Sequence, residues 1–468
     1  GGGIPRGALV FLVGSPGAGK TILASQILFE AARAGSRGLI FTAFSEGPVK
    51  LLAHLRTLTF FDEELIGSQI TVLSLPTVIG DDVTRAASAI VHEIRQNGAQ
   101  MVLVDGFQGV AAFLESPTTI RRTLADLANL LSYLDVVLLV TLEGAGRSAT
   151  ISSELTTADT ILGLEYRAEQ GRHIRSLDVV KQRGTAHLAG LHPYQVGADG
   201  VRIFPRFESL PLPDSVAITR APAPFGLPEL DALLHGGLTR GTTTILAGAP
   251  GVGKTTLGLF WALATANPSA STLMVSFAEQ PAQLQEKSTA FHLQLQAAQT
   301  AGAIQLLRLS PVEIVPDVVA SAILAALLPT TTRLVVDDLA GLLHALGDRG
   351  ASFLSALVAQ CDARGITSLF LLEIEPLAGL RLSLANTALS LISDNVIILQ
   401  HLLAQGRLHR VLAVLKMRYN DYDPTIREMV LDAQGVRVLT PSQTAPGVLD
   451  DAADSGGGFA PSDDVDGI

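Results

Sequence analysis

One segment of the chain occurs twice, and this repeat constrains the fold more than any other feature. GGGIPRGALVFLVGSPGAGKT (1–21) returns as HGGLTRGTTTILAGAPGVGKT (235–255). Four matches that keep nearly one spacing indicate an internal duplication, so we expect two copies of a domain of roughly 220 residues. The further landmarks recur in the same order at offsets of 232 to 235 residues: Lys20 with Lys254, Glu46 with Glu279, Asp105 with Asp337, and Arg183 with Arg418.

Each copy alternates short β-rich runs with longer runs rich in Ala and Leu. Strands that alternate with helices imply right-handed crossovers and a mainly parallel, twisted sheet flanked by helices. The sequence therefore predicts an α/β fold in two tandem domains. In the first copy we expect strands at 8–14, 38–44, 100–106 and 136–143 and a helix at 21–35; the β-type runs 175–184 and 409–418 are expected to add antiparallel edges.

Both copies carry the pattern GxxxxGK[ST] between an expected strand and an expected helix. The glycines let backbone N–H groups turn inward around phosphate oxygens, and the following helix presents its positive N-terminus to the same anion. Glycine-rich turns also occur without ligands, but two full motifs in this context favour two sites for ATP and Mg²⁺. The expected binding residues are Gly14, Gly17, Gly19, Lys20 and Thr21, and then Gly248, Gly251, Gly253, Lys254 and Thr255.

Two acidic positions in each copy follow expected strands. Asp105 ends VLVDG and Asp337 lies in LVVDD, where it is preferred to Asp338 because it matches Asp105 in the repeat. An aspartate there is typical of a residue that orients hydrated Mg²⁺, together with the P-loop threonine, although alone it is more often a helix cap. Glu46 and Glu279 precede proline-containing helix starts. We expect them to polarise the attacking water as general bases; the alternative is a glutamate that complements a helix dipole.

A basic pair recurs near the end of each copy, as Lys181 and Arg183 in KQR and as Lys416 and Arg418 in KMR. Alternation along a strand places both members of a pair on one face. Such a pair can protect an exposed sheet edge, or it can reach the γ-phosphate of a neighbouring subunit as a cationic finger. The repetition of the pair favours the finger.

Charge and composition exclude several functional classes. The net charge is −11, and six aspartates with no Lys or Arg follow residue 440. Proteins that grip phosphate backbones usually show a basic face, so nucleic acid is not an expected partner. No apolar run has the length of a membrane span, and we expect no membrane partner. A single cysteine and the lack of a signal-peptide pattern lead us to expect a cytoplasmic location.

Proline and acidic residues suggest the domain boundaries. PFGLPELDALLHGG (224–237) precedes the second P-loop and has no counterpart before the first, so we expect the first domain to be N-terminally incomplete. Prolines at high density disfavour continuous helix or strand and indicate a linker. The expected parts are a first domain at 1–204, a Pro-rich linker at 205–222, a second domain at 223–440 and an acidic disordered tail at 441–468.

The chain resembles the KaiC family of duplicated clock ATPases within the wider RecA/RadA superfamily. The resemblance covers about residues 1–440 and depends on GGxxRG before each P-loop and on the strand–Glu–x–Pro segments. Its most specific parts are KQRGTAHLAGLHPYQVGADGVRIFP (181–205) and KMRYNDYDPTIREMVLDAQG (416–435). The resemblance implies two RecA-like P-loop NTPase domains in a homohexameric double ring, with ATP at each subunit interface facing the basic pair of the next subunit. It also implies slow ATP hydrolysis in the first domain, serine/threonine autokinase activity in the second and regulatory protein partners.

The sequence departs from the family pattern at both sites. The family commonly has two adjacent glutamates after the second strand, whereas this chain has Ser45-Glu46 and Ala278-Glu279. The adjacent Ser-Thr acceptors of the clock protein fall at Ser390 and Leu391, so Ser390 is the one expected phospho-acceptor; an ordinary buried or capping serine is the alternative. Two other functions stay open: a RadA- or DnaB-like DNA recombination or repair ATPase, and a scaffold that ATP assembles with little turnover.

Overall fold

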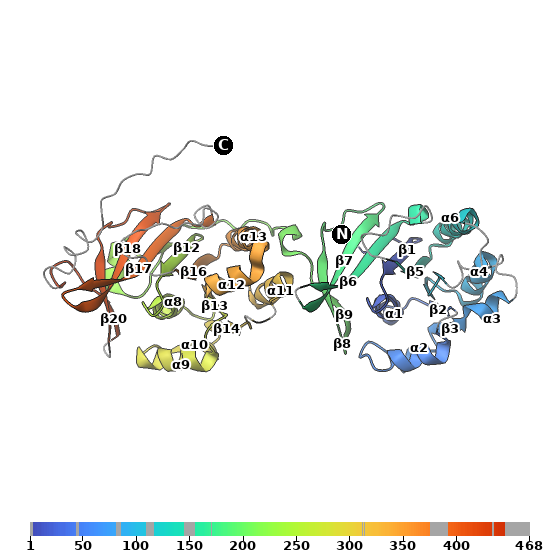
Figure 1. The fold of residues 1–468 in the computed structure, drawn as a ribbon, viewed down its shortest axis with the longest axis horizontal. Helices are drawn as coiled ribbons and strands as arrows, with labels where there is room; N and C mark the ends of the chain where they lie inside the picture. The colour runs from blue at the N-terminus through green and yellow to red at the C-terminus, as the bar shows by residue number, and fades with distance from the viewer. Residues whose placement is uncertain are drawn as a thin grey trace, which may run out of the picture. The chain divides into compact units, whose positions relative to one another are not determined.

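The computed structural model divides the chain into two compact units, Gly1–Leu210 and Pro211–Ile468 (Figure 1). Each unit is described by itself. The structure describes residues 3–43, 46–80, 86–108, 117–144, 155–169, 171–310, 312, 314–374, 392–432 and 435–444.

The first unit contains a nine-stranded sheet in the order β3-β2-β4-β5-β1-β6-β7-β8-β9. The strands from β3 to β6 pair in parallel, and β7, β8 and β9 add the antiparallel edge. The strands are β1 (Leu9–Gly14), β2 (Gly38–Thr42), β3 (Ile70–Ser74), β4 (Met101–Asp105), β5 (Val137–Glu143), β6 (Thr160–Glu169), β7 (Arg172–Gln182), β8 (His192–Gly197) and β9 (Gly200–Ile203). The helices are α1 (Lys20–Arg33), α2 (Pro48–Leu55), α3 (Leu75–Ile79), α4 (Ala86–Asn97) and α6 (Pro117–Leu134), with short 3₁₀ turns at Glu63–Leu65, Leu155–Thr157 and Phe207–Ser209.

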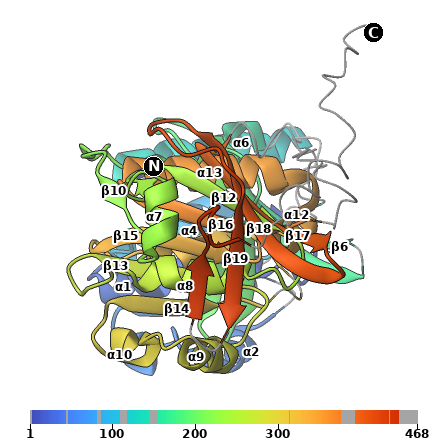
Figure 2. The same ribbon diagram turned by 90° about the vertical axis from the view of Figure 1, so that its left-hand side faces the viewer.

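The second unit repeats this topology as β14-β13-β15-β16-β12-β17-β18-β19-β20. Its strands are β12 (Thr243–Gly248), β13 (Ser271–Ser276), β14 (Ile304–Arg308), β15 (Thr331–Asp337), β16 (Thr367–Glu373), β17 (Asn395–Ala404), β18 (Arg407–Met417), β19 (Arg427–Asp432) and β20 (Gly435–Val438), beside the small pair β10 (Pro222–Ala223) and β11 (Leu238–Thr239). Its helices are α7 (Pro228–Leu233), α8 (Lys254–Leu263), α9 (Pro281–Ala290), α10 (Leu295–Thr300), α11 (Pro316–Ala326), α12 (Leu339–Leu346) and α13 (Gly350–Ala363), with the 3₁₀ turn η5 (Gly347–Arg349). Figure 2 turns the second unit toward the viewer, with α9 and α10 at the bottom and α13 near the top.

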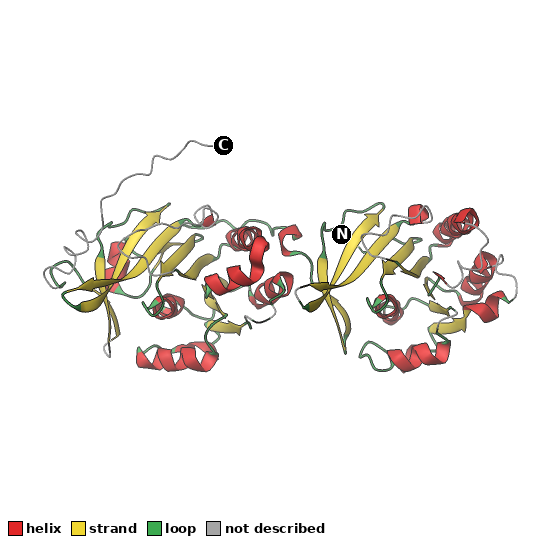
Figure 3. Cartoon of the chain, viewed as in Figure 1, coloured by secondary structure: helices red, strands yellow, loops and turns green. Residues whose placement is uncertain are grey.

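The central strands are mostly apolar because helices cover both sheet faces, and their polar residues gather at the strand ends. In the first unit Leu9 and Phe11 pack with α4 and α6 on one face, and Val10 and Leu12 pack with α1 and α2 on the other. In the second unit Trp261 of α8 is fully buried in the main core cluster. Figure 3 shows the resulting layers of helix and strand in each unit. The predicted α/β fold with two tandem, mainly parallel sheets is confirmed.

The boundary between the units falls inside the Pro-rich segment 205–222. Phe207, at its start, is buried in the first unit. Further along, the N–H of Val216 donates to the carbonyl of Ala363, and the guanidinium of Arg220 stacks 3.5 Å from the ring centre of Tyr419. This part of the segment is therefore packed along the second unit. Among the residues that the structure describes, no helix is long and apolar enough to cross a membrane.

Candidate functional site

Each P-loop connects the central strand of its sheet to the helix that follows. β1 ends at Gly14 and α1 begins at Lys20; β12 ends at Gly248 and α8 begins at Lys254. A methyl group on Gly248 would lie 2.6 Å from the carbonyl oxygen of Leu399, so the tight packing of the loop against β17 requires glycine there. The loops also use left-handed backbone, which glycine adopts without a steric cost. The positive φ angles are 77° at Gly17, 89° at Gly19, 71° at Gly251 and 111° at Gly253.

The P-loop lysines lie at the centre of the turns. Nζ of Lys20 donates to the carbonyl oxygens of Gly14 and Ser15, at 2.9 and 3.0 Å. Nζ of Lys254 makes the equivalent bonds to Gly248 and Ala249, again at 2.9 and 3.0 Å. Burial lowers the pKa of Lys20. The negative charges of Glu143 and Asp105 partly oppose this decrease. Both loops thus curl around an ammonium group, as a phosphate cradle requires.

The threonine that follows each lysine is bonded to the aspartate that ends a neighbouring strand. Oγ1 of Thr21 donates to Oδ1 of Asp105 at 2.9 Å, and Oγ1 of Thr255 donates to Oδ2 of Asp337 at 2.8 Å. The next residue, Asp338, instead accepts bonds from the first N–H groups of α12. In the second unit the cap and the site aspartate are therefore two different residues.

Asp337 lies in a strongly desolvated place. Burial raises its pKa to about 6, the bond from Thr255 opposes this rise, and the charge of Glu279 adds to it. Groups of three or more His, Cys, Asp or Glu side chains that would form an all-protein metal cage are not found in the described ranges. One hydroxyl and one carboxylate nevertheless fit Mg²⁺, because this ion usually takes one or two protein ligands together with waters and substrate phosphates.

Glu46 and Glu279 lie just before the helices that follow β2 and β13. Each is two residues ahead of the helix-starting proline, and Gln280, not Glu279, makes the capping box of α9. Oε1 of Glu279 accepts a bond from Nζ of Lys287, while its buried Oε2 has no partner among the described residues. In the first unit Oε1 of Glu46 lies 2.9 Å from Nδ1 of His54, an ion-pair approach without good hydrogen-bond alignment.

The loops that carry the two glutamates differ in length. Thr42 and Ser276 are equivalent, since they pair with the strand-ending aspartates Asp105 and Asp337. Glu46 lies four residues after its strand end and Glu279 only three. The first copy therefore carries a one-residue insertion at the loop that holds this carboxylate.

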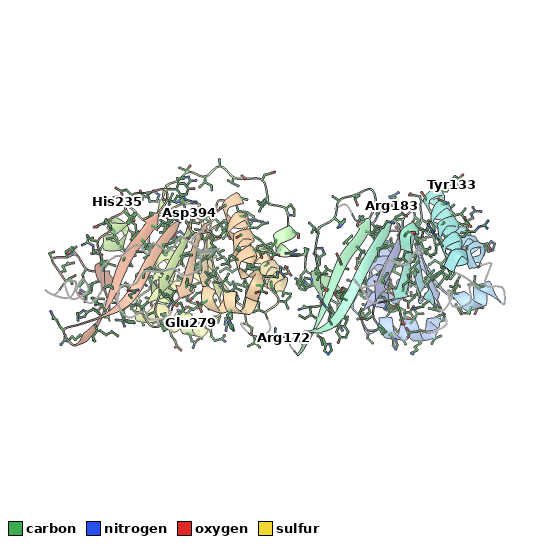
Figure 4. All side chains as sticks on the ribbon, turned by 45° about the horizontal axis from the view of Figure 1, so that its top comes forward. Tyr133, Arg172, Arg183, His235, Glu279 and Asp394 are labelled. Atoms are coloured by element: carbon green, nitrogen blue, oxygen red, sulfur yellow. The ribbon has the colours of Figure 1, made fainter. Side chains whose placement is uncertain are left out.

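The basic pairs lie toward the opposite end of the strands from the P-loop of the same unit. Lys416 pairs with Val396 near the amino end of β17, whereas Gly248 pairs with Leu399 further toward the carboxyl end. Val396 pairs in turn with Ile245, so at about 3.3 Å per residue the rows of Lys416 and Gly248 are roughly 10 Å apart. Figure 4 shows Glu279 and Asp394, the residue that holds Arg418, on opposite edges of the second unit.

Hydrogen bonds hold the lysines and arginines of these pairs at that end of the strands. Nζ of Lys181 donates to the carbonyl of Thr156 at 2.8 Å, and Nζ of Lys416 donates to that of Ser393 at 2.7 Å. Each arginine faces an aspartate that begins the adjacent strand and also accepts a backbone bond from the P-loop strand. The guanidinium–carboxylate distances are 3.5 Å for Arg183 and Asp159 and 3.2 Å for Arg418 and Asp394.

Several residues that touch the site were not found from the sequence. Oγ1 of Thr141 donates to Oδ1 of Asp105 at 2.7 Å and thereby orients that carboxylate. Oε2 of Glu373 approaches Nζ of Lys254 to 3.5 Å. Asp159 and Asp394 recur at the offset of 235 residues that also relates the two basic pairs, so the repeat did contain a signal for them. The expected phospho-acceptor Ser390 lies outside the described residues.

Comparisons with known proteins agree with this geometry. A family model described as the ATPase KaiC matches residues 1–208 and, a second time, residues 223–443. The circadian clock oscillator protein KaiC of Picosynechococcus sp. is 24% identical over 453 residues, which cover 93% of this chain and 86% of that protein. The protein of the same name from Thermostichus vulcanus is 25% identical over 464 residues, covering 96% and 88%. The circadian clock protein KaiC3 of Synechocystis sp. is 25% identical over 465 residues, covering 96% and 91%.

Proposed function

The chain belongs to the KaiC family of ATPases, and we propose that it hydrolyses Mg-ATP slowly at two sites in a cytoplasmic homohexamer. The observation that carries the proposal is the complete repeat of one arrangement: a lysine inside a glycine loop, and a threonine bonded to a strand-ending aspartate. We further propose that the second unit phosphorylates its own chain at Ser390 and that regulatory proteins bind the assembly.

The phosphate cradle supplies binding and charge compensation. When ATP enters, the ammonium groups of Lys20 and Lys254 exchange their carbonyl partners for β- and γ-phosphate oxygens. The loop N–H groups and the positive end of α1 or α8 add to the binding of the triphosphate. Thr21 with Asp105, and Thr255 with Asp337, would hold Mg²⁺, which when bound would supply neutralisation of the phosphate charge.

The glutamates supply the base. In the second unit the buried, unpartnered Oε2 of Glu279 is the atom that accepts the proton of the attacking water, while Oε1 stays bound to Lys287. In the first unit Glu46 is the proposed base, and its buried oxygen without a hydrogen-bond partner among the described residues is Oε1. Since each site has one carboxylate in place of an adjacent pair, we expect turnover to be slow.

The basic pairs complete the site of a neighbouring subunit. Lys416 and Arg418 lie toward the end of the strands that is remote from their own P-loop. They therefore serve the γ-phosphate of another copy. The same reasoning applies to Lys181 and Arg183. Both arginines are more than half exposed, so they are available for a contact between subunits. A cationic finger of this kind contributes about 10³–10⁵ in rate.

The test is incubation of the full chain with γ-labelled ATP and Mg²⁺, with free phosphate and protein-bound label followed together. Phosphate release that falls in both Lys20→Ala and Lys254→Ala supports two hydrolytic sites. Label that disappears in Ser390→Ala supports the autokinase, whereas phosphate release from an unlabelled chain rejects it. ATP binding without either product favours the scaffold and removes the catalytic roles of Glu46 and Glu279.

A further inference from the structure

Each candidate base has a basic neighbour at the same position of the repeat. His54 and Lys287 lie eight residues after Glu46 and Glu279, and each is the seventh residue of its helix. Both point back toward the glutamate that precedes that helix. Nδ1 of His54 lies 2.9 Å from Oε1 of Glu46, and Nζ of Lys287 donates to Oε1 of Glu279.

The contact in the second unit is more than a solvated surface pair. The side chains of Lys287 and Glu279 are only 28% and 24% exposed, and Oε2 of Glu279 is buried. The backbone around the glutamate is fixed as well, because Ser276 Oγ accepts from its N–H at 3.1 Å and donates to its carbonyl at 2.9 Å. With one carboxylate oxygen held, the other has a defined direction.

We propose that Lys287 is a positioning residue: it holds Oε1 of Glu279 so that Oε2 faces the attacking water. His54 gives no such hold in the first unit, because Oε1 of Glu46 has no hydrogen-bond partner among the described residues and the His54 side chain is 64% exposed. The inference rests on the proposed role of Glu279.

The experiment measures kcat and KM for ATP hydrolysis by the full chain. A Lys20→Ala background reports the second site and a Lys254→Ala background the first. The first site supplies the matched control: His54→Met should leave its kcat unchanged, because His54 makes no hydrogen bond to Glu46.

Two further variants separate positioning from a merely structural role. Lys287→Met should lower kcat of the second site about fivefold with little change in KM, and Lys287→Arg should restore it. A kcat of the second site that is unchanged or raised in Lys287→Met overturns the inference.

The roles of the bases are tested separately with Glu46→Gln and Glu279→Gln. Full activity in these variants removes the proposed base roles of Glu46 and Glu279. Lost activity in them, combined with an unchanged kcat in Lys287→Met, removes only the positioning role.

Discussion

Replacing Arg349 with methionine should destabilise the second unit by about 3 kcal/mol. Arg349 ends η5 and binds Asp317 through two bonds, at 2.8 and 2.9 Å. The side chain of Asp317 is fully buried, while about a third of Arg349 is exposed. The pair connects η5 to the first turn of α11.

The magnitude follows from the environment of the carboxylate. Removing one partner of a buried ion pair costs about 3–5 kcal/mol, because the other charge stays buried without compensation. Asp317 is the second residue of α11, and the positive end of that helix recovers about 0.3–1 kcal/mol for a negative charge in its first turn. The expected loss is therefore near the lower end of the range.

Urea unfolding followed by tryptophan fluorescence measures the effect, since Trp261 is the one tryptophan of the chain and is buried in the second unit. The matched control is Arg437→Met, which breaks an exposed pair with Asp432 in the same unit and should cost less than about 1 kcal/mol. Asp317→Leu combined with Arg349→Met should recover most of the stability, because an apolar pair leaves no buried charge. A loss below about 1 kcal/mol for Arg349→Met alone would refute the reasoning.

Three other changes test the site. Thr141→Val should reduce Mg²⁺-dependent turnover of the first site about tenfold, because its hydroxyl orients the strand-ending aspartate; turnover against Mg²⁺ concentration in a chain without the second P-loop lysine measures this. Asp394→Asn should lower kcat of the second site about fivefold without changing ATP affinity, because it weakens the hold on Arg418; steady-state rates decide it, and an unchanged kcat contradicts it. Gly248→Ala should abolish ATP binding at the second site, because its methyl group meets the carbonyl of Leu399 at 2.6 Å; titration with a fluorescent ATP analogue checks this.

The parts of the fold that could be predicted are those encoded locally. The helix expected at 21–35 begins at Lys20 and ends at Arg33, where Gly35 at φ 93° donates back to Ala32 and stops it. The P-loop was predictable because strand, glycine turn and helix are contiguous in sequence. The order of the strands was not, because crossovers place β1 between β5 and β6 through contacts that no local pattern records.

The same distinction explains what was missed at the site. Thr141 bonds Asp105 only because parallel pairing brings the ends of β4 and β5 together. In the sequence, His54 and Lys287 look like ordinary residues on helix surfaces. Each comes close to its glutamate only because its helix packs next to the loop that precedes it. Aligning the two copies shows that His54 and Lys287 are equivalent, but it does not show that they approach Glu46 and Glu279.

The two copies share one backbone plan, and the chemical differences lie on the side chains that surround the reacting groups. The glycine loops, the lysines and the Thr–Asp bonds recur at equivalent positions of the two copies. We therefore expect both units to bind the triphosphate alike. The base differs in its loop length and in the partner of Oε1. Binding residues act on substrate and transition state together, whereas the base acts in the transition state. Divergence at the base therefore changes turnover while it preserves nucleotide binding, and this is how a duplicated ATPase can keep two sites that run at different rates.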